Sequence, residues 1–258
     1  MNANKPNSET RRSAALASGI SLLLMAAAAA YAYGFVHSRL ILPDDPAATA
    51  ANLRASSGLF RTEIFGWLVI LICDVVAAWA LYVYFEPVQR GLSLLAAGLR
   101  FAYTAVLGTA AAFLVLALLW AERSETVMNG LLDDSAALLT GTFDLVWSIG
   151  LVVFGLHLLV LGILALRAAF MPRWVGVLLL IAGPGYLIVH LARLLLPGGM
   201  AIPALLETAL SVPMAAGELG LALWLLIRGG RETAVRPLPA PNAEDVGDAG
   251  VRSPRSSS

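Results

Sequence analysis

Hydrophobic residues form six long stretches along this chain, and most charged residues lie between the stretches. The stretches cover residues 14–36, 63–85, 92–120, 136–166, 174–196 and 204–227. Each is longer than the roughly 20 residues with which a helix crosses the hydrocarbon core of a bilayer. The apolar residues are continuous, whereas the strands of a membrane barrel alternate apolar and polar residues. The pattern therefore predicts an all-α bundle of six transmembrane helices.

Composition also indicates a lipid bilayer as the environment of the chain. Charged residues make up 13% of the sequence and apolar residues 59%, whereas about a quarter of a soluble domain is charged. The formal net charge is +0, which gives no reason to expect nucleic acid as a partner. Cys73 is the only cysteine, which excludes an intramolecular disulfide and a cysteine zinc site. No protein partner is indicated.

Basic residues near the ends of the stretches predict the orientation in the membrane. With the N-terminus inside, eight lie at cytoplasmic ends and four at outer ends. The cytoplasmic set is Lys5, Arg11, Arg12, Arg90, Arg167, Arg173, Arg228 and Arg231, and the outer set is Arg39, Arg54, Arg61 and Arg123. This bias predicts that both termini are cytoplasmic. Residues 1–12 and 229–258 are polar and are expected to be disordered, which leaves residues 13–228 as one membrane domain.

A cleaved signal peptide is an alternative interpretation of the first stretch. Arg11 and Arg12 precede the apolar run, and Ala30-Tyr31-Ala32 is similar to a signal-peptidase site. Cleavage would leave five helices and would put the arginine-rich C-terminal end outside. The apolar run also exceeds the roughly 7 to 15 residues of a signal peptide. We therefore favour six helices, although the sequence leaves cleavage open.

A short outer helix is predicted between the first two membrane helices. Asp45 can cap it, Pro46 suits its first position and Gly58 can end it. The helix is expected to rest on the membrane surface or across the mouth of the bundle. It is either a structured connector or a lid over a cavity.

Ionisable residues inside the apolar stretches form two levels when residues are counted from the ends of the stretches. A charged group costs roughly 3 kcal/mol at the middle of a bilayer unless it is paired or hydrated, so such groups normally face the interior of the bundle. The inner level contains Asp74, Arg100, His157 and Glu218, and the outer level contains Glu63, Asp144, His190, Arg193 and Glu207.

Two interpretations of these levels remain open. The residues can be polar cross-links that hold apolar helices together, as in a structural or partner-binding subunit. Alternatively, they can handle protons or a small solute, with Asp74 or Glu218 as proton acceptor, His157 as its partner and Arg100 as a fixed counter-charge. Two apolar stretches are also interrupted by proline. The interruptions, Gly183-Pro184-Gly185 and Ser211-Val212-Pro213, either kink their helices or break them, as in transporters.

The sequence contains no recognised enzyme motif. His37, His157 and His190 lack metal-ligand spacing, so no metal and no cofactor is expected. An intramembrane hydrolase could use Ser148, His157 and Asp144. However, His157 lies more than two turns beyond Ser148, which disfavours a triad. An enzyme is therefore the least favoured of the three functional hypotheses.

Several segments resemble the bacterial integral-membrane family known as domain of unknown function 4386. The clearest are the run from Ile149 to Gly162, which contains Phe154-Gly155-Leu156-His157, and the run from Met171 to Leu179, which contains Met171-Pro172-Arg173. Cys73-Asp74-Val75, Arg100 in its helix and Gly217-Glu218 are also similar to that family's pattern. The resemblance covers about residues 14–228. It implies a multi-pass protein of a bacterial inner membrane with an unassigned activity, and it singles out the inner-level residues as a group.

Overall fold

The structure is a computed structural model that describes residues 8–123, 129–197 and 200–231. Within these ranges there are six helices long and apolar enough to cross a membrane, and no strands, which confirms the all-α six-helix prediction. The first runs from α1 (Ser8–Tyr31) through a π-helical turn, η1 (Ala32–His37), into the short α2 (Ser38–Leu40). The other five are α4 (Ser57–Phe85), α5 (Arg90–Arg123), α6 (Asn129–Arg167), α7 (Arg173–Leu195) and α8 (Ile202–Ile227).

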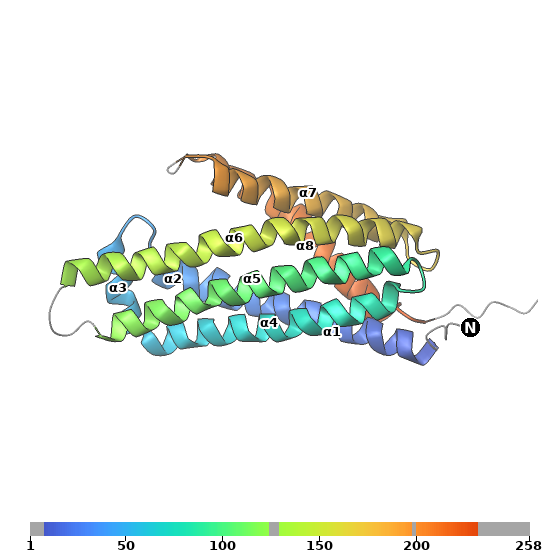
Figure 1. Cartoon of the computed structure of the whole chain (residues 1–258), viewed down its shortest axis with the longest axis horizontal. Helices are drawn as coiled ribbons and strands as arrows, with labels where there is room; N and C mark the ends of the chain where they lie inside the picture. Colours follow the sequence, from blue (N-terminus) through green and yellow to red (C-terminus); the bar gives the residue numbers. More distant parts are fainter. Residues whose placement is uncertain (1–7, 124–128, 198–199, 232–258) are drawn as a thin grey trace, which may run out of the picture.

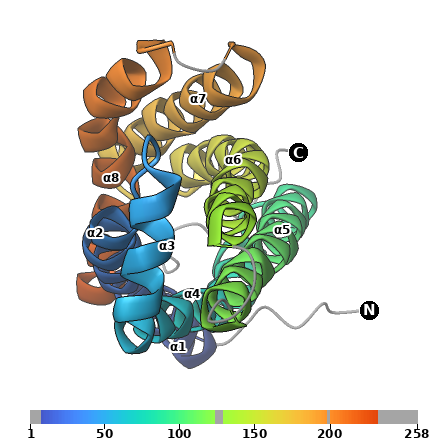
Figure 2. The ribbon, with the colours of Figure 1, turned by 90° about the vertical axis from the view of Figure 1, so that its left-hand side faces the viewer.

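The six long helices form a ring of neighbours. From α4 to α8 each helix packs against the next one along the chain, and α1 packs against both α4 and α8 to close the ring (Figures 1 and 2). Large apolar side chains such as Ile72, Trp79 and Leu205 are more than half exposed on the outside of the bundle. This exposure is expected for side chains that face lipid.

Both described ends of the chain meet at one end of the bundle, which we call the inner end. The Arg12 guanidinium donates hydrogen bonds to the carbonyl oxygens of Leu226 at 2.9 Å and Gly229 at 2.6 Å. Arg11 lies over the Phe170 ring, 4.5 Å from its centroid. These contacts fix the start of α1, so the helix begins at Ser8, inside the segment expected to lack order. Most of the expected C-terminal tail lies outside the described residues.

The short outer helix is α3 (Pro46–Ala55), and Asp45 caps it as predicted by accepting the Ala48 N–H at 2.9 Å. The expected end at Gly58 is wrong, since α3 stops three residues earlier and Gly58 lies inside α4. The backbone at Ser56 has φ −125° and ψ 35°, which separates the two helices. α3 packs against the outer ends of α5 and α6, at the left of Figure 1, and therefore rests on the bundle.

Neither internal proline breaks its helix. α7 continues through Pro184 and α8 continues through Pro213, so the broken-helix alternative does not hold.

Close packing between α6 and α7 depends on two glycine pairs. A Cβ placed on Gly155 would lie 2.8 Å from the Gly183 carbonyl oxygen, and one on Gly183 would lie 2.9 Å from the Gly155 oxygen. Gly162 and Gly176 repeat this contact one heptad nearer the inner end, where a Cβ on Gly162 would lie 3.1 Å from the Gly176 oxygen. Small residues at such positions allow membrane helices to approach closely, because association in lipid depends on van der Waals packing.

We predict that Gly155→Ala lowers the free energy of unfolding by about 1–3 kcal/mol, since the new methyl group meets backbone rather than a flexible side chain. Gly98→Ala is the matched control. A Cβ on Gly98 meets nothing within 4 Å, so this change should leave stability equal or raise it by up to about 1 kcal/mol. Thermal unfolding of both variants in one detergent checks the prediction. Equal melting temperatures for the two variants would show that the close packing does not matter.

Candidate functional site

A cavity of about 430 Å³ lies inside the helix ring and is lined by residues of α1, η1 and α4 to α8. Its ionisable lining side chains are Asp74, Arg100, His190, Arg193, Glu207 and Glu218. Its aromatic lining side chains are Tyr33, Trp67, Tyr103, Trp147, Phe154 and Tyr186. Residues from both predicted levels therefore share one cavity.

Arg100 on α5 is the largest charged group in the interior, and its side chain is 2% exposed. Its Nη2 lies 2.6 Å from Oδ1 of Asp74 on α4, and its Nη1 lies 3.3 Å from Nε2 of His157 on α6. The face of the Phe154 ring is 5.4 Å from the guanidinium carbon, within the range of a cation–π interaction. One guanidinium group therefore joins three neighbouring helices.

The contacts of His157 define its tautomer. Nδ1 lies 2.8 Å from the Ala96 carbonyl oxygen, which can only accept, so Nδ1 carries the proton and donates it. Nε2 then accepts from the Arg100 N–H, which requires a neutral imidazole. Both ring nitrogens are engaged in holding Arg100. This geometry gives His157 a positioning role and does not fit the proton-relay partner that the sequence suggested.

The ion pair leaves hydrogen-bonding capacity on the cavity wall. Oδ1 of Asp74 is engaged by Arg100, whereas Oδ2 has no hydrogen-bond partner among the described residues. Arg100 Nε also lacks one there. Because an unsatisfied buried polar group is costly, these atoms are available to a polar or charged group inside the cavity.

Glu218 on α8 forms no hydrogen bond or ion pair with the other three inner-level residues. Its Oε1 accepts a hydrogen bond from the Tyr186 hydroxyl of α7 at 2.5 Å. None of the ion pairs found within the described part of the chain includes Glu218. The structure thus brings Asp74, Arg100 and His157 into contact and places Glu218 elsewhere on the wall of the same cavity.

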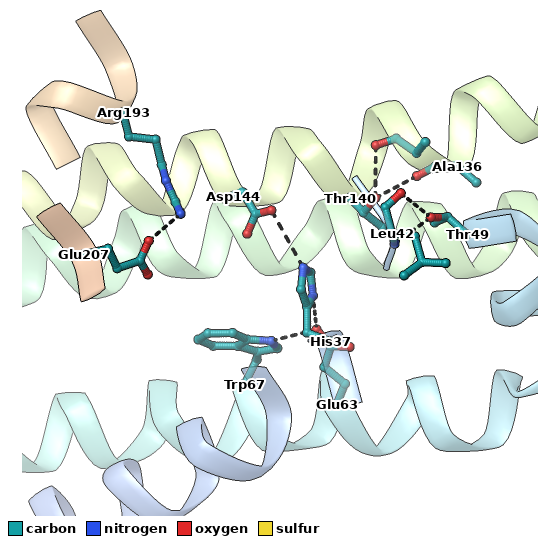
Figure 3. Close-up of polar contacts among 11 residues, drawn as sticks. His37, Leu42, Thr49, Glu63, Trp67, Ala136, Thr140, Asp144, Arg193 and Glu207 are labelled. Carbon is teal, nitrogen blue, oxygen red and sulfur yellow. Dashed lines mark hydrogen bonds and ion pairs between the residues drawn. The ribbon is translucent and has the colours of Figure 1, made fainter. Parts of the chain in front are cut away.

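The outer-level residues form three separate groups. His37 lies between two carboxylates, with Nδ1 2.8 Å from Glu63 Oε1 and Nε2 3.7 Å from Asp144 Oδ2 (Figure 3). Only an imidazolium can donate on both sides, so this geometry fits a protonated His37. Arg193 pairs with Glu207 at 2.8 Å (Figure 3). His190 Nδ1 lies 3.3 Å from Ser148 Oγ.

Sequence reasoning missed His37 as a member of this outer group. It ended the first stretch at Val36, whereas the π-helical turn continues the helix and brings His37 beside Glu63. The sequence did offer a signal, because His37 directly follows the first apolar stretch and Glu63 is the first residue of the second, so both lie at the outer end of the bundle. The aromatic lining was also missed, because aromatic residues in membrane helices are common and their facing is not visible in sequence.

The three candidate hydrolase residues have different partners and do not form a triad. Ser148 contacts His190, Asp144 contacts His37, and His157 contacts Arg100 and Ala96. Ser148 is fully buried. In the described ranges, no three His, Cys, Asp or Glu side chains gather where they could hold a metal ion.

Comparison with known proteins places the chain in a family. Residues 17–229 match the model of the family described as Domain of unknown function (DUF4386). The chain belongs to this family. An uncharacterised protein of the archaeon Archaeoglobus fulgidus is 31% identical over 177 residues, which cover 69% of this chain and 90% of the relative. No solved structure matches the chain. The family membership supports a multi-pass membrane protein and assigns no activity.

We predict that Asp74→Asn and Arg100→Gln each lower the free energy of unfolding by about 3–5 kcal/mol, because each leaves one buried charge without its counter-charge. The double variant removes both charges and should lose less than the sum of the two single losses. Unfolding in detergent, measured for all four proteins, gives the coupling energy. Strictly additive losses would mean that the two side chains do not interact.

Proposed function

We propose that the protein is a membrane permeation protein in which the cavity binds a small solute and Glu218 accepts and releases a proton. The observation that carries this proposal is a carboxylate without an ion-pair partner among the described residues, on the wall of a 430 Å³ cavity. Ionisable groups inside membrane spans are costly and commonly mark ion, proton or solute pathways.

Glu218 suits the proton-accepting role better than Asp74. Asp74 lies 2.6 Å from a buried guanidinium group, so protonating it would leave Arg100 without a counter-charge. Three groups influence the charge of the Glu218 carboxyl group, by electrostatic interaction or hydrogen bonding: Tyr186 of α7, Arg100 of α5 and Asp74 of α4. Among the described residues Tyr186 hydrogen-bonds Glu218 and no cation pairs with it, and a hydroxyl can donate to the carboxylate or accept from the carboxylic acid. Glu218 can therefore change protonation without breaking an ion pair.

The depth of Glu218 also supports this role. It lies nine residues before the end of α8 at Ile227, which corresponds to roughly 14 Å along the helix. The polar lining continues outward from it to the Arg193–Glu207 pair. A proton or solute at Glu218 would thus be well inside the membrane, with polar groups between it and the outer end.

We predict that Glu218→Gln abolishes proton movement driven by a potassium diffusion potential in proteoliposomes loaded with a pH-sensitive dye. The amide keeps the size of the side chain but cannot exchange a proton near neutral pH. Glu122→Gln is the matched control, because Glu122 pairs with Arg61 at the outer end and does not line the cavity.

Proton movement that is unchanged in Glu218→Gln, or wild-type vesicles that behave as protein-free vesicles, would contradict the proposal. A structural subunit would instead show a lower melting temperature in Glu218→Gln and no proton movement in any variant. Melting temperatures of the same preparations separate the two results.

A further inference from the structure

The cavity has a side that faces the bilayer, between α1 and α8. At the inner end these helices touch: a Cβ on Gly19 would lie 3.0 Å from the Ala222 carbonyl oxygen, and Arg12 binds the end of α8. Toward the outer end, the α7–α8 hairpin tilts away from α1 (Figure 1). The cavity therefore lies where the two helices have separated.

The residues along this side are small or apolar. Ala26 and Ala29 of α1 line the cavity on one edge, and Ser211, Ala215 and Leu219 of α8 line it on the other. The three α8 residues are exposed even though they line the cavity, so the cavity is open along this edge. A molecule dissolved in the bilayer could reach the cavity here without crossing the polar ends.

The charges around the cavity favour a cationic ligand. Its lining carries three carboxylates, Asp74, Glu207 and Glu218, and two guanidinium groups, Arg100 and Arg193. Each guanidinium group is already paired with a carboxylate, so Glu218 provides one net negative charge when it is ionised. Oδ2 of Asp74, on a side chain that is nine-tenths or more buried, has no hydrogen bond among the described residues and adds one further acceptor.

The aromatic lining favours the same class of ligand. Six aromatic side chains line the cavity, and aromatic faces attract organic cations through their quadrupoles. Phe154 already has the Arg100 guanidinium over its face, whereas Tyr186 contacts Glu218 and Tyr103 lines the same cavity. A lipophilic cation would combine an apolar body for these rings with a positive charge for Glu218.

We propose that the cavity takes up a lipophilic organic monocation from the bilayer through the side between α1 and α8. The cation pairs with the Glu218 carboxylate, and the carboxylic acid proton of Glu218 leaves to water as the cation binds. One positive charge enters for each proton released, so the charge of the site is conserved. This inference rests on the proposed proton exchange at Glu218 and adds the class of the solute and its route.

Tetraphenylphosphonium and tetraphenylborate are suitable probes, since they have nearly the same shape and opposite charge. We expect wild-type protein in lipid nanodiscs to bind the phosphonium ion saturably and to bind the borate ion no more than protein-free nanodiscs do. Glu218→Gln should lose phosphonium binding, whereas Glu122→Gln should keep it. In weakly buffered solution near neutral pH, binding should release about one proton for each cation, and binding without proton release would contradict the exchange at Glu218.

The route is tested by filling the side between α1 and α8. Ala215→Trp should slow or abolish phosphonium binding, because the large indole ring would fill the gap beside α8 through which the cation enters. Ala105→Trp is the matched control on the lipid-exposed face of α5, away from the cavity, and should bind as the wild type does.

The outcomes separate this inference from the proposed function. If Glu218→Gln stops proton movement in proteoliposomes but wild-type protein binds neither probe, or binds both equally, the cation inference is wrong and the proposed function stands. If phosphonium binds equally well to Glu218→Gln, the assignment of the cation to Glu218 is wrong. If Ala215→Trp binds at the wild-type rate, the route between α1 and α8 is wrong.

Discussion

The buried Arg100 guanidinium is the group on which the rest of this structure depends. An arginine inside a membrane helix costs several kcal/mol unless it is paired and hydrogen-bonded. Here α4 supplies the Asp74 carboxylate, α6 supplies His157 and α5 carries the arginine itself. Since the charge is stable only when all three helices are in place, the ion pair fixes their mutual depth and rotation. Helix association in lipid lacks a hydrophobic driving force, so such contacts contribute specificity as well as stability.

A second consequence of these contacts is that most buried ionisable groups are held in one protonation state, whereas Glu218 is the group that we propose exchanges a proton. His157 is neutral because its Nε2 accepts a hydrogen bond from Arg100, and Asp74 is held as the counter-ion of Arg100. His37 has carboxylates on both sides and fits the charged form. Glu218, on α8, has a tyrosine hydroxyl as its one hydrogen-bond partner among the described residues. α8 packs mainly against α7 and the inner end of α1, so the carboxylate we regard as exchangeable lies on one of the least enclosed helices.

Much of the fold could be predicted from the sequence, because the lengths of the apolar stretches and a cap such as Asp45 are local signals. Counting residues along the helices also placed Asp74, Arg100 and His157 at one depth, and in the structure they touch. The depth of a residue along its helix does not determine which neighbour its side chain faces, however. Residue counting gives Glu218 a similar depth, yet its carboxylate accepts a hydrogen bond from Tyr186 instead. His37 was missed because the π-helical turn that positions it has no recognised sequence signal, and the break at Ser56 could not be distinguished from one at Gly58.

The tautomer of His157 is the most direct test of this account, because it reports the Arg100 contact without requiring a ligand. The chain has three histidines, so ¹⁵N NMR resonances of histidine-labelled protein can be assigned with one substitution at each. We predict a neutral His157 with the proton on Nδ1 from mildly acidic to alkaline pH. The same resonance should change when Arg100 is replaced by Gln. A His157 that titrates near neutral pH, or that carries its proton on Nε2, would contradict the proposed anchoring of Arg100.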